Sequence, residues 1–82
     1  MLSIPVLITV DRVDSNTENV LSKYMKITNR WDKFNMYAGD IELQGNTPKE
    51  REAFYTKVIL DMLKEPCVRT IKKSVYLEPL GD

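Results

Sequence analysis

The chain contains no histidine, one cysteine and three glycines among its 82 residues. Without histidine, the serine–histidine and cysteine–histidine pairs that activate nucleophiles are excluded. A single cysteine cannot form a disulfide within the chain, and zinc, which prefers several cysteine or histidine ligands, is not expected. The glycines are scattered and form no glycine-rich phosphate loop. These absences remove most of the common catalytic and metal-binding sites.

The chain also has no excess of positive or negative charge. Twelve basic residues balance twelve acidic ones, which argues against a protein that wraps nucleic acid. The apolar fraction of 43% is typical of a folded chain, and the length predicts a single domain over residues 1–82. So small a domain buries only about 60–65% of its unfolded surface, and small domains often gain stability by association. Association into a homodimer is therefore the most available means by which this chain could gain stability.

The apolar segment at the start of the chain does not resemble a targeting signal. Residues 1–10 are apolar but short, no Lys or Arg precedes them, and Asp11 and Arg12 follow directly. This pattern matches neither a signal peptide nor a membrane span. Together with the unpaired Cys67, it predicts a cytoplasmic protein without membrane contact.

The first third of the chain predicts a strand and then a helix. Residues 4–13 form a short, β-branched apolar run with Pro5 near its start, as in a strand buried on both faces. Ser15, Asn16 and Thr17 are possible N-caps for a helix over residues 16–30, whose apolar positions fall at helical spacing. The alternative is a strand through residues 24–28, where a period of two also fits.

The middle of the chain combines an ambiguous strand with a clear helix. In residues 33–43 the apolar phase changes at Gly39, which predicts either one bulged strand or a tight hairpin. Thr47, Pro48 and Glu50 then form a capping box at the start of a helix over residues 48–64. Its apolar face is expected to comprise Ala53, Phe54, Val58, Met62 and Leu63, widened by Tyr55, Ile59 and Leu60.

Residues 67–80 predict a closing strand with a possible bulge at residues 72–74. The element order is then β, α, β or ββ, α, β. Two helices on one face of a small antiparallel sheet give the split βαβ, ferredoxin-like arrangement (βαββαβ) of an α+β fold. This is the fold that the sequence predicts.

Two carboxylates and the cysteine are the only candidates for chemistry. Asp11 and Asp14 stand where the first strand gives way to a loop, and carboxylates with water can hold Mg²⁺ or Mn²⁺. The favoured interpretation is structural, with Asp11 ending the strand and Asp14 beginning the helix cap. Cys67 follows Pro66 at the expected start of a strand, where a buried, inert thiol is the more common state.

Basic and aromatic side chains mark possible partner-binding positions. On and after the first predicted helix, Lys23, Lys26, Arg30 and Lys33 accompany Tyr24 and Trp31, and Arg69, Lys72 and Lys73 lie close together on the last predicted strand. Basic residues interleaved with aromatic ones can bind RNA phosphates and stack bases. Nearby acidic residues weaken the positive electrostatic potential of these side chains, so an ordinary solvated face is the favoured interpretation.

Residues 36–40 (MYAGD) and residues 66–71 (PCVRTI) resemble strand segments of the VapD family. An aspartate that ends the first strand, here Asp11, recurs in that family and in related CRISPR-associated ferredoxin-like nucleases. The resemblance covers about a quarter of the chain. It implies a ferredoxin-like dimer with ribonuclease activity and with Asp11 near the dimer axis.

Three functions remain as hypotheses. The favoured one is a non-enzymatic interaction protein, a small regulator, inhibitor or accessory factor such as viruses encode, in which Tyr24, Trp31, Arg69, Lys72 and Lys73 contact a protein partner. The second is a metal-dependent ribonuclease with Asp11 and Asp14 as catalytic residues, Asp11 as metal ligand and Mg²⁺ or Mn²⁺ as cofactor. The third is an RNA-binding module that uses Arg69, Lys72 and Lys73. Neither this module nor the favoured interaction protein is expected to need a cofactor.

Overall fold

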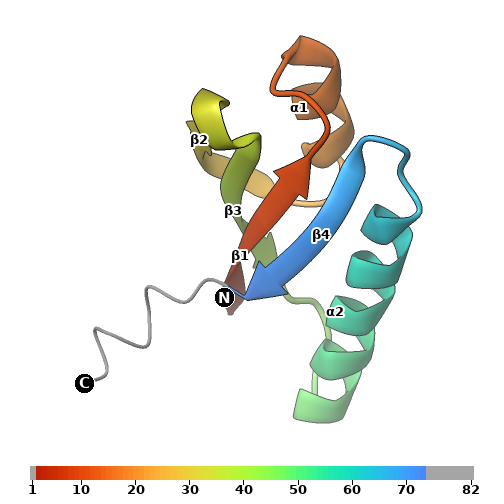
Figure 1. The fold of residues 1–82 in the computed structure, drawn as a ribbon. Helices are drawn as coiled ribbons and strands as arrows, with labels where there is room; N and C mark the ends of the chain where they lie inside the picture. Colours follow the sequence, from red (N-terminus) through yellow and green to blue (C-terminus); the bar gives the residue numbers. More distant parts are fainter. Residues whose placement is uncertain (1, 74–82) are drawn as a thin grey trace.

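The computed structural model describes residues 2–73 (Figure 1). Four strands and two helices follow one another in the order βαββαβ, with a short 3₁₀ turn between the second and third strands. The elements are β1 (Ser3–Val10), α1 (Ser15–Leu21), β2 (Lys26–Trp31), the 3₁₀ turn η1 (Asp32–Phe34), β3 (Met36–Glu42), α2 (Pro48–Leu63) and β4 (Val68–Lys73).

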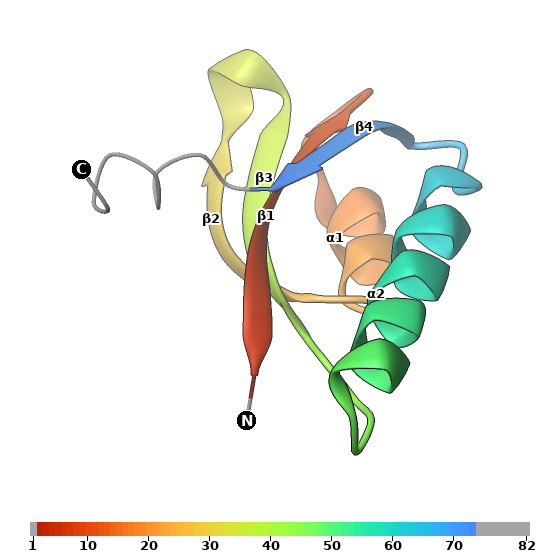
Figure 2. The ribbon, with the colours of Figure 1, turned by 90° about the horizontal axis from the view of Figure 1, so that it is seen from below.

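The strands form one antiparallel sheet in the order β2-β3-β1-β4. Both helices lie on the same side of this sheet, and no helix of residues 2–73 covers the other side (Figure 2). The ferredoxin-like prediction is therefore confirmed. Alternate residues of the two central strands face the helices and form the centre of the core with one fully buried apolar residue from each helix: Val6, Ile8, Val10, Tyr37, Ile41, Leu21 and Met62.

The first strand is shorter than the sequence predicts. It ends at Val10 rather than at residue 13, although the Asp11 N–H still donates to the Cys67 carbonyl at 3.0 Å. Val13 packs against the core from the following loop. Its apolar character therefore reflects burial in a loop, which a strand pattern cannot distinguish from burial in a sheet.

The predicted helix over residues 16–30 is wrong in its second half. α1 ends at Leu21, whose carbonyl accepts from the N–H groups of Tyr24 and Met25, and the chain continues as β2. The alternative strand interpretation of residues 24–28 is correct from Lys26 onward. Pairing with β3 satisfies the backbone of this segment, and such tertiary pairing overrides a helical spacing of apolar side chains.

Residues 36–42 form a single strand, and the phase change expected at Gly39 does not occur. Tyr37, Gly39 and Ile41 all face the helices. The prediction instead assigns Met36 and Ala38, which face the other side of the sheet, to the apolar face of this segment. Gly39 is needed there because a Cβ atom would lie 2.6 Å from the Lys26 carbonyl oxygen and 2.8 Å from Met25 Sδ. The irregularity lies instead in β2, where the register shifts between Ile27 and Asn29.

The capped helix is confirmed over Pro48–Leu63, and the Thr47 hydroxyl accepts from the Glu50 N–H at 3.1 Å. Its buried face is narrower than predicted. Met62 is buried, and Tyr55, Val58 and Ile59 pack against the core. The other apolar residues of the predicted face lie outside this core cluster. Phe54 is half-buried, and three side chains point to solvent: Ala53, Leu60 and Leu63.

The closing strand is present over Val68–Lys73, and residues 74–80 of that prediction lie outside the described residues. The bulge falls at Arg69, because Val10 pairs with Val68 while Thr9 pairs with Thr70. Lys72 and Lys73 pair regularly with β1, so these two positions of the predicted 72–74 bulge are regular. The extra residue brings both Val68 and Ile71 to the helix side of the sheet.

Candidate functional site

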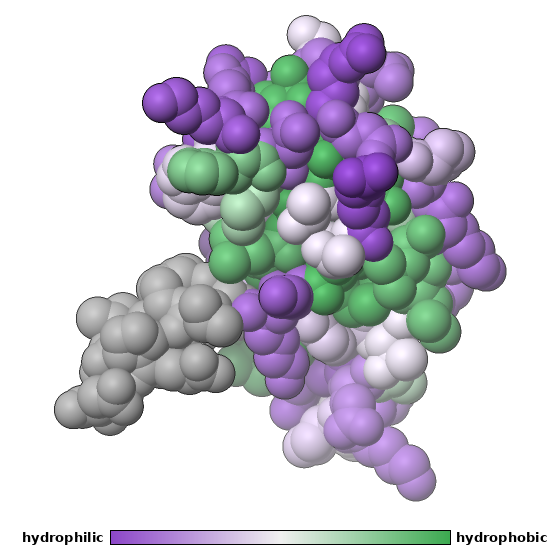
Figure 3. All heavy atoms as spheres, viewed as in Figure 1, coloured by the Kyte–Doolittle hydropathy of each residue, from purple (hydrophilic) through white to green (hydrophobic). Residues whose placement is uncertain are grey.

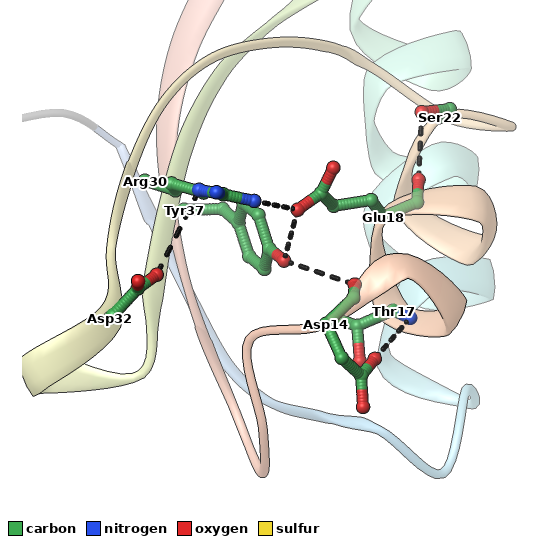
Figure 4. A network of polar contacts seen from close by, with 7 residues as sticks. All are labelled: Asp14, Thr17, Glu18, Ser22, Arg30, Asp32 and Tyr37. Carbon is green, nitrogen blue, oxygen red and sulfur yellow. Dashed lines mark hydrogen bonds and ion pairs between the residues drawn. The ribbon is translucent and has the colours of Figure 1, made fainter.

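Asp14 acts as the N-cap of α1. Its Oδ1 accepts a hydrogen bond from the Thr17 N–H at 2.8 Å, and this bond lowers the pKa of the carboxyl from its usual value of 3.8 (Figure 4). A carboxylate favours the positive end of a helix. The cap is therefore Asp14 rather than Ser15, Asn16 or Thr17, and the structural interpretation of Asp14 is confirmed.

A polar network links α1 to β2 and β3 (Figure 4). The Tyr37 hydroxyl lies 3.1 Å from Glu18 Oε2 and 3.3 Å from the Asp14 carbonyl oxygen, and Arg30 Nη1 donates to the same Glu18 oxygen. Burial, reinforced by Glu18, raises the pKa of Tyr37 to about 12. The network satisfies the one polar atom of a fully buried aromatic side chain, so its role is to position α1.

Asp11 follows the last residue of β1 and forms an ion pair with Arg69. Its Oδ1 lies 2.7 Å from Arg69 Nε, and both side chains are more than half exposed. A divalent cation at Asp11 would have to compete with this guanidinium. Within residues 2–73, no group of three or more Cys, Asp or Glu side chains is placed to hold a metal ion.

Cys67 is half-buried at the entrance to β4, and burial raises the pKa of its thiol. A thiol with a raised pKa carries little thiolate at neutral pH and is a poor nucleophile. These observations agree with an inert packing role for Cys67.

Tyr24 contacts another part of the same chain. Its hydroxyl donates to Glu65 Oε2 at 2.5 Å, and this hydrogen bond raises the pKa of Tyr24 to about 12. The bond joins the turn after α1 to the turn after α2, and the ring packs against the core. This bond and the packing of the ring hold Tyr24 in place within the domain.

The three basic residues of β4 point in different directions. Arg69 sits at the bulge, where it pairs with Asp11. Lys72 pairs with Leu7 and shares its side of the sheet, which is the side without helices. Lys73 pairs with Val6 on the helix side, where its Nζ lies 5.9 Å from the centre of the Tyr55 ring. The structure does not join them into one basic patch.

Trp31 lies at the tip of the β2–β3 hairpin beside a second aromatic residue. Trp31 and Phe34 are 39% and 66% exposed as whole residues, and both line a shallow pocket of about 350 Å³ together with Arg30, Asp32 and Lys33. We call residues 30–34 the hairpin tip. The sequence pattern did not indicate Phe34 as a contact, because Phe34, Met36 and Ala38 stand at alternate positions and belong to the predicted strand.

The backbone of the hairpin tip forms a tight turn. Residues 32–34 form the 3₁₀ turn, and Asn35 adopts the left-handed conformation with a φ of 51°. Asparagine tolerates this conformation better than most residues, which is the sequence signal for a turn here. The Asn35 carbonyl accepts from the Val10 N–H at 2.9 Å, so the turn is anchored to the central strand β1.

The side of the sheet without helices is mixed in character. Cross-strand register places Trp31, Met36, Thr9 and Thr70 in one row and Asn29, Ala38, Leu7 and Lys72 in the next. The central strands β1 and β3 thus contribute aliphatic and hydroxyl side chains to these rows and no aromatic ring. The single-stranded RNA binders that use such a sheet stack bases on aromatic residues of its strands.

Comparisons of the chain with protein-family models, with curated proteins and with solved structures find no match. No helix within residues 2–73 is long and apolar enough to cross a membrane.

Proposed function

We propose that this protein is a non-enzymatic protein-binding domain, a small regulator, inhibitor or accessory factor, and that the hairpin tip is its main contact. The observation that carries the proposal is the exposure of Trp31 and Phe34 on an ordered turn. Tryptophan is enriched at the energetic centres of protein interfaces, and truncating such an anchor typically costs about 2 kcal/mol or more.

The surroundings of the two aromatic rings support this function. Arg30, Asp32 and Lys33 border them, as a polar rim borders the apolar centre of an interface. The turn and the Val10–Asn35 hydrogen bond hold the backbone in place before binding, so less conformational entropy is lost in the complex. The fitting partner is a folded protein with an apolar pocket that accepts the rings.

The two other hypotheses receive less support from the described residues. Asp14 caps a helix and Asp11 pairs with Arg69, so neither carboxylate is left for a metal without rearrangement. The basic residues of β4 diverge, and the uncovered rows of the sheet lack stacking rings on β1 and β3. A nuclease or an RNA-binding module would need groups that these elements do not bring together.

Capture of binding partners from a lysate, compared among variants, tests the proposal. We expect wild type and Leu60→Ala to recover the same protein, while Trp31→Ala and Phe34→Ala lose it at unchanged thermal stability. Leu60 is the matched control because it is 55% exposed on the far side of α2. Equal recovery by all four proteins would refute the hairpin tip as the contact.

A second assay separates the three hypotheses. The purified protein is incubated with labelled RNA, with and without Mg²⁺ or Mn²⁺. We expect neither cleavage nor a shift in RNA mobility. Metal-dependent cleavage would favour the ribonuclease, and a salt-sensitive shift without cleavage would favour the RNA-binding module.

A further inference from the structure

The outer edge of β4 is open. β4 is the last strand of the sheet, and within residues 2–73 no strand pairs with the side of it that faces away from β1. Figure 1 shows β4 running beside β1, and the space-filling view from the same side shows strongly hydrophilic residues projecting beside apolar and neutral ones (Figure 3). An edge strand offers backbone N–H and C=O groups that a further strand can pair with.

The charges along this edge are all positive. β4 reads VRTIKK, with three basic residues and no acidic one, and the Arg69, Lys72 and Lys73 side chains are exposed. Only Arg69 has an acidic partner among the described residues. The two lysines lie on opposite sides of the sheet, Lys72 beside Leu7 and Lys73 over Tyr55.

We propose that the β4 edge accepts an extended segment of another protein that carries acidic residues at two consecutive positions. Side chains of an added strand alternate between the two faces of the sheet. Two consecutive acidic residues would therefore point to opposite faces, where one meets Lys72 and the other meets Lys73. This contact is separate from the hairpin tip and does not depend on it.

Two other occupants fit this edge less well. A second copy of the chain paired through β4 would bring only positively charged side chains, and no acidic ones, to the new strand pair. Like charges directly opposite one another destabilise a strand pair. RNA binds through a continuous row of phosphates and through bases that stack on aromatic rings. Lys72 and Lys73 face opposite sides of the sheet, and the residues beside Lys72 and Thr70 on β1 are Leu7 and Thr9. These positions therefore offer RNA neither one row of cations nor an aromatic ring.

Selection of peptides from a random library on the full chain tests the proposal. Peptides of about ten residues cover the usual length of a strand. We expect consecutive Asp or Glu residues among β-branched ones, and we expect the doubly substituted Lys72→Glu/Lys73→Glu protein to select consecutive basic residues instead. Binding should also slow amide hydrogen exchange along β4.

A selected acidic peptide gives the quantitative test. Its affinity should fall about fivefold for Lys72→Gln/Lys73→Gln, the effect of losing two exposed cross-strand ion pairs. It should not change for the matched control Lys57→Gln/Lys64→Gln, on α2 and at its C-cap, nor for Phe34→Ala at the hairpin tip.

Several results would overturn the proposal. These are a selection without acidic pairs, equal affinity for the two double variants, or exchange protection outside β4. Loss of peptide binding in Phe34→Ala would move the contact to the hairpin tip. Tight binding of single-stranded RNA that needs Lys72 and Lys73 would assign the edge to nucleic acid, and sedimentation as a dimer that Lys72→Glu/Lys73→Glu abolishes would assign it to a second copy.

Discussion

At the scale of single residues, the two aspartates near the end of β1 show how position decides the role of a carboxylate. Asp14 is followed by a helix, so its side chain turns to the Thr17 N–H. Asp11 lies beside the start of β4, so its side chain turns to Arg69. Each has a partner that explains its presence without metal chemistry, and each can be tested by a neutral substitution.

Substitution of Asp14 should change the pH dependence of stability. The pKa of this carboxyl is lowered in the folded state, so its contribution is fully present above the ordinary value of 3.8 and is lost as the pH falls through the lower folded value. Asp14→Asn should retain a capping oxygen but lose this acid-dependent part, whereas Asp14→Ala should lose the cap at every pH. Urea midpoints measured between about pH 7 and 2 check both expectations.

If the urea midpoints of wild type and Asp14→Asn fall equally as the pH is lowered, the hydrogen bond to Thr17 does not lower the pKa of Asp14. Asp32→Asn serves as the control, because the Asp32 carboxylate is largely exposed and its contact with Arg30 Nε is long, at 3.8 Å.

Substitution of Asp11 distinguishes a surface ion pair from a metal site. Asp11→Asn removes one partner of an exposed pair, so we expect the free energy of unfolding to change by only a few tenths of a kcal/mol. Neither wild type nor the variant should be stabilised by Mn²⁺ in thermal unfolding. Stabilisation of wild type alone would instead identify Asp11 as a ligand.

At the scale of elements, α2 shows how a helix with apolar residues on several faces is oriented. Three consecutive apolar residues, Val58, Ile59 and Leu60, cannot all face the sheet. The structure buries Met62 with Tyr55, Val58 and Ile59, and leaves Leu60 and Leu63 exposed. The Thr47 cap and Pro48 determine where the helix begins, but packing against β4 and the core determines its rotation.

Two alanine substitutions in α2 measure this rotation. Met62→Ala should lower the free energy of unfolding by about 2–5 kcal/mol, because it removes a fully buried side chain and leaves a cavity. Leu60→Ala should change it by less than about 0.5 kcal/mol, as is usual for exposed positions. Urea unfolding followed by circular dichroism gives both values, and similar losses for the two variants would contradict the observed orientation.

At the scale of the whole molecule, the sheet provides the stable frame and α1 is the shorter of its two helices. β1 pairs with both β3 and β4, whereas α1 has seven residues and isolated helices shorter than about 12–15 residues are marginal in water. Two buried residues, Thr17 and Leu21, and the Tyr37–Glu18 contact hold α1 in place.

Hydrogen exchange should therefore reveal local opening of α1 before the sheet opens. We expect α1 amides to exchange faster than those of β1 and β3, because local unfolding needs less free energy where fewer groups are buried. Tyr37→Phe should speed exchange in α1 further by removing the hydroxyl that contacts Glu18. Equal protection of α1 and β1 would show that the domain opens as one unit.

The sequence by itself determined the features that depend on neighbouring residues. The β-branched run identified β1, and the Thr47–Pro48–Glu50 motif located the start of α2. The succession of elements predicted the ferredoxin-like fold, although its second strand lies at residues 26–31 and not within residues 33–43. It also indicated Trp31 as a candidate contact and identified Asp14 as part of a helix cap. Caps and buried strands are local, so their signals are written in adjacent residues.

Only the tertiary structure decided the features that depend on distant residues. Pairing with β3 ended α1 at Leu21 and made residues 26–31 a strand, and the sheet selected which apolar residues of α2 are buried. Phe34 became a candidate contact only when the turn exposed it beside Trp31. Lys72 and Lys73 were separated by the alternation of β4, because neighbouring side chains of a strand point to opposite faces. These outcomes follow from contacts between segments far apart in the chain, which no local pattern specifies.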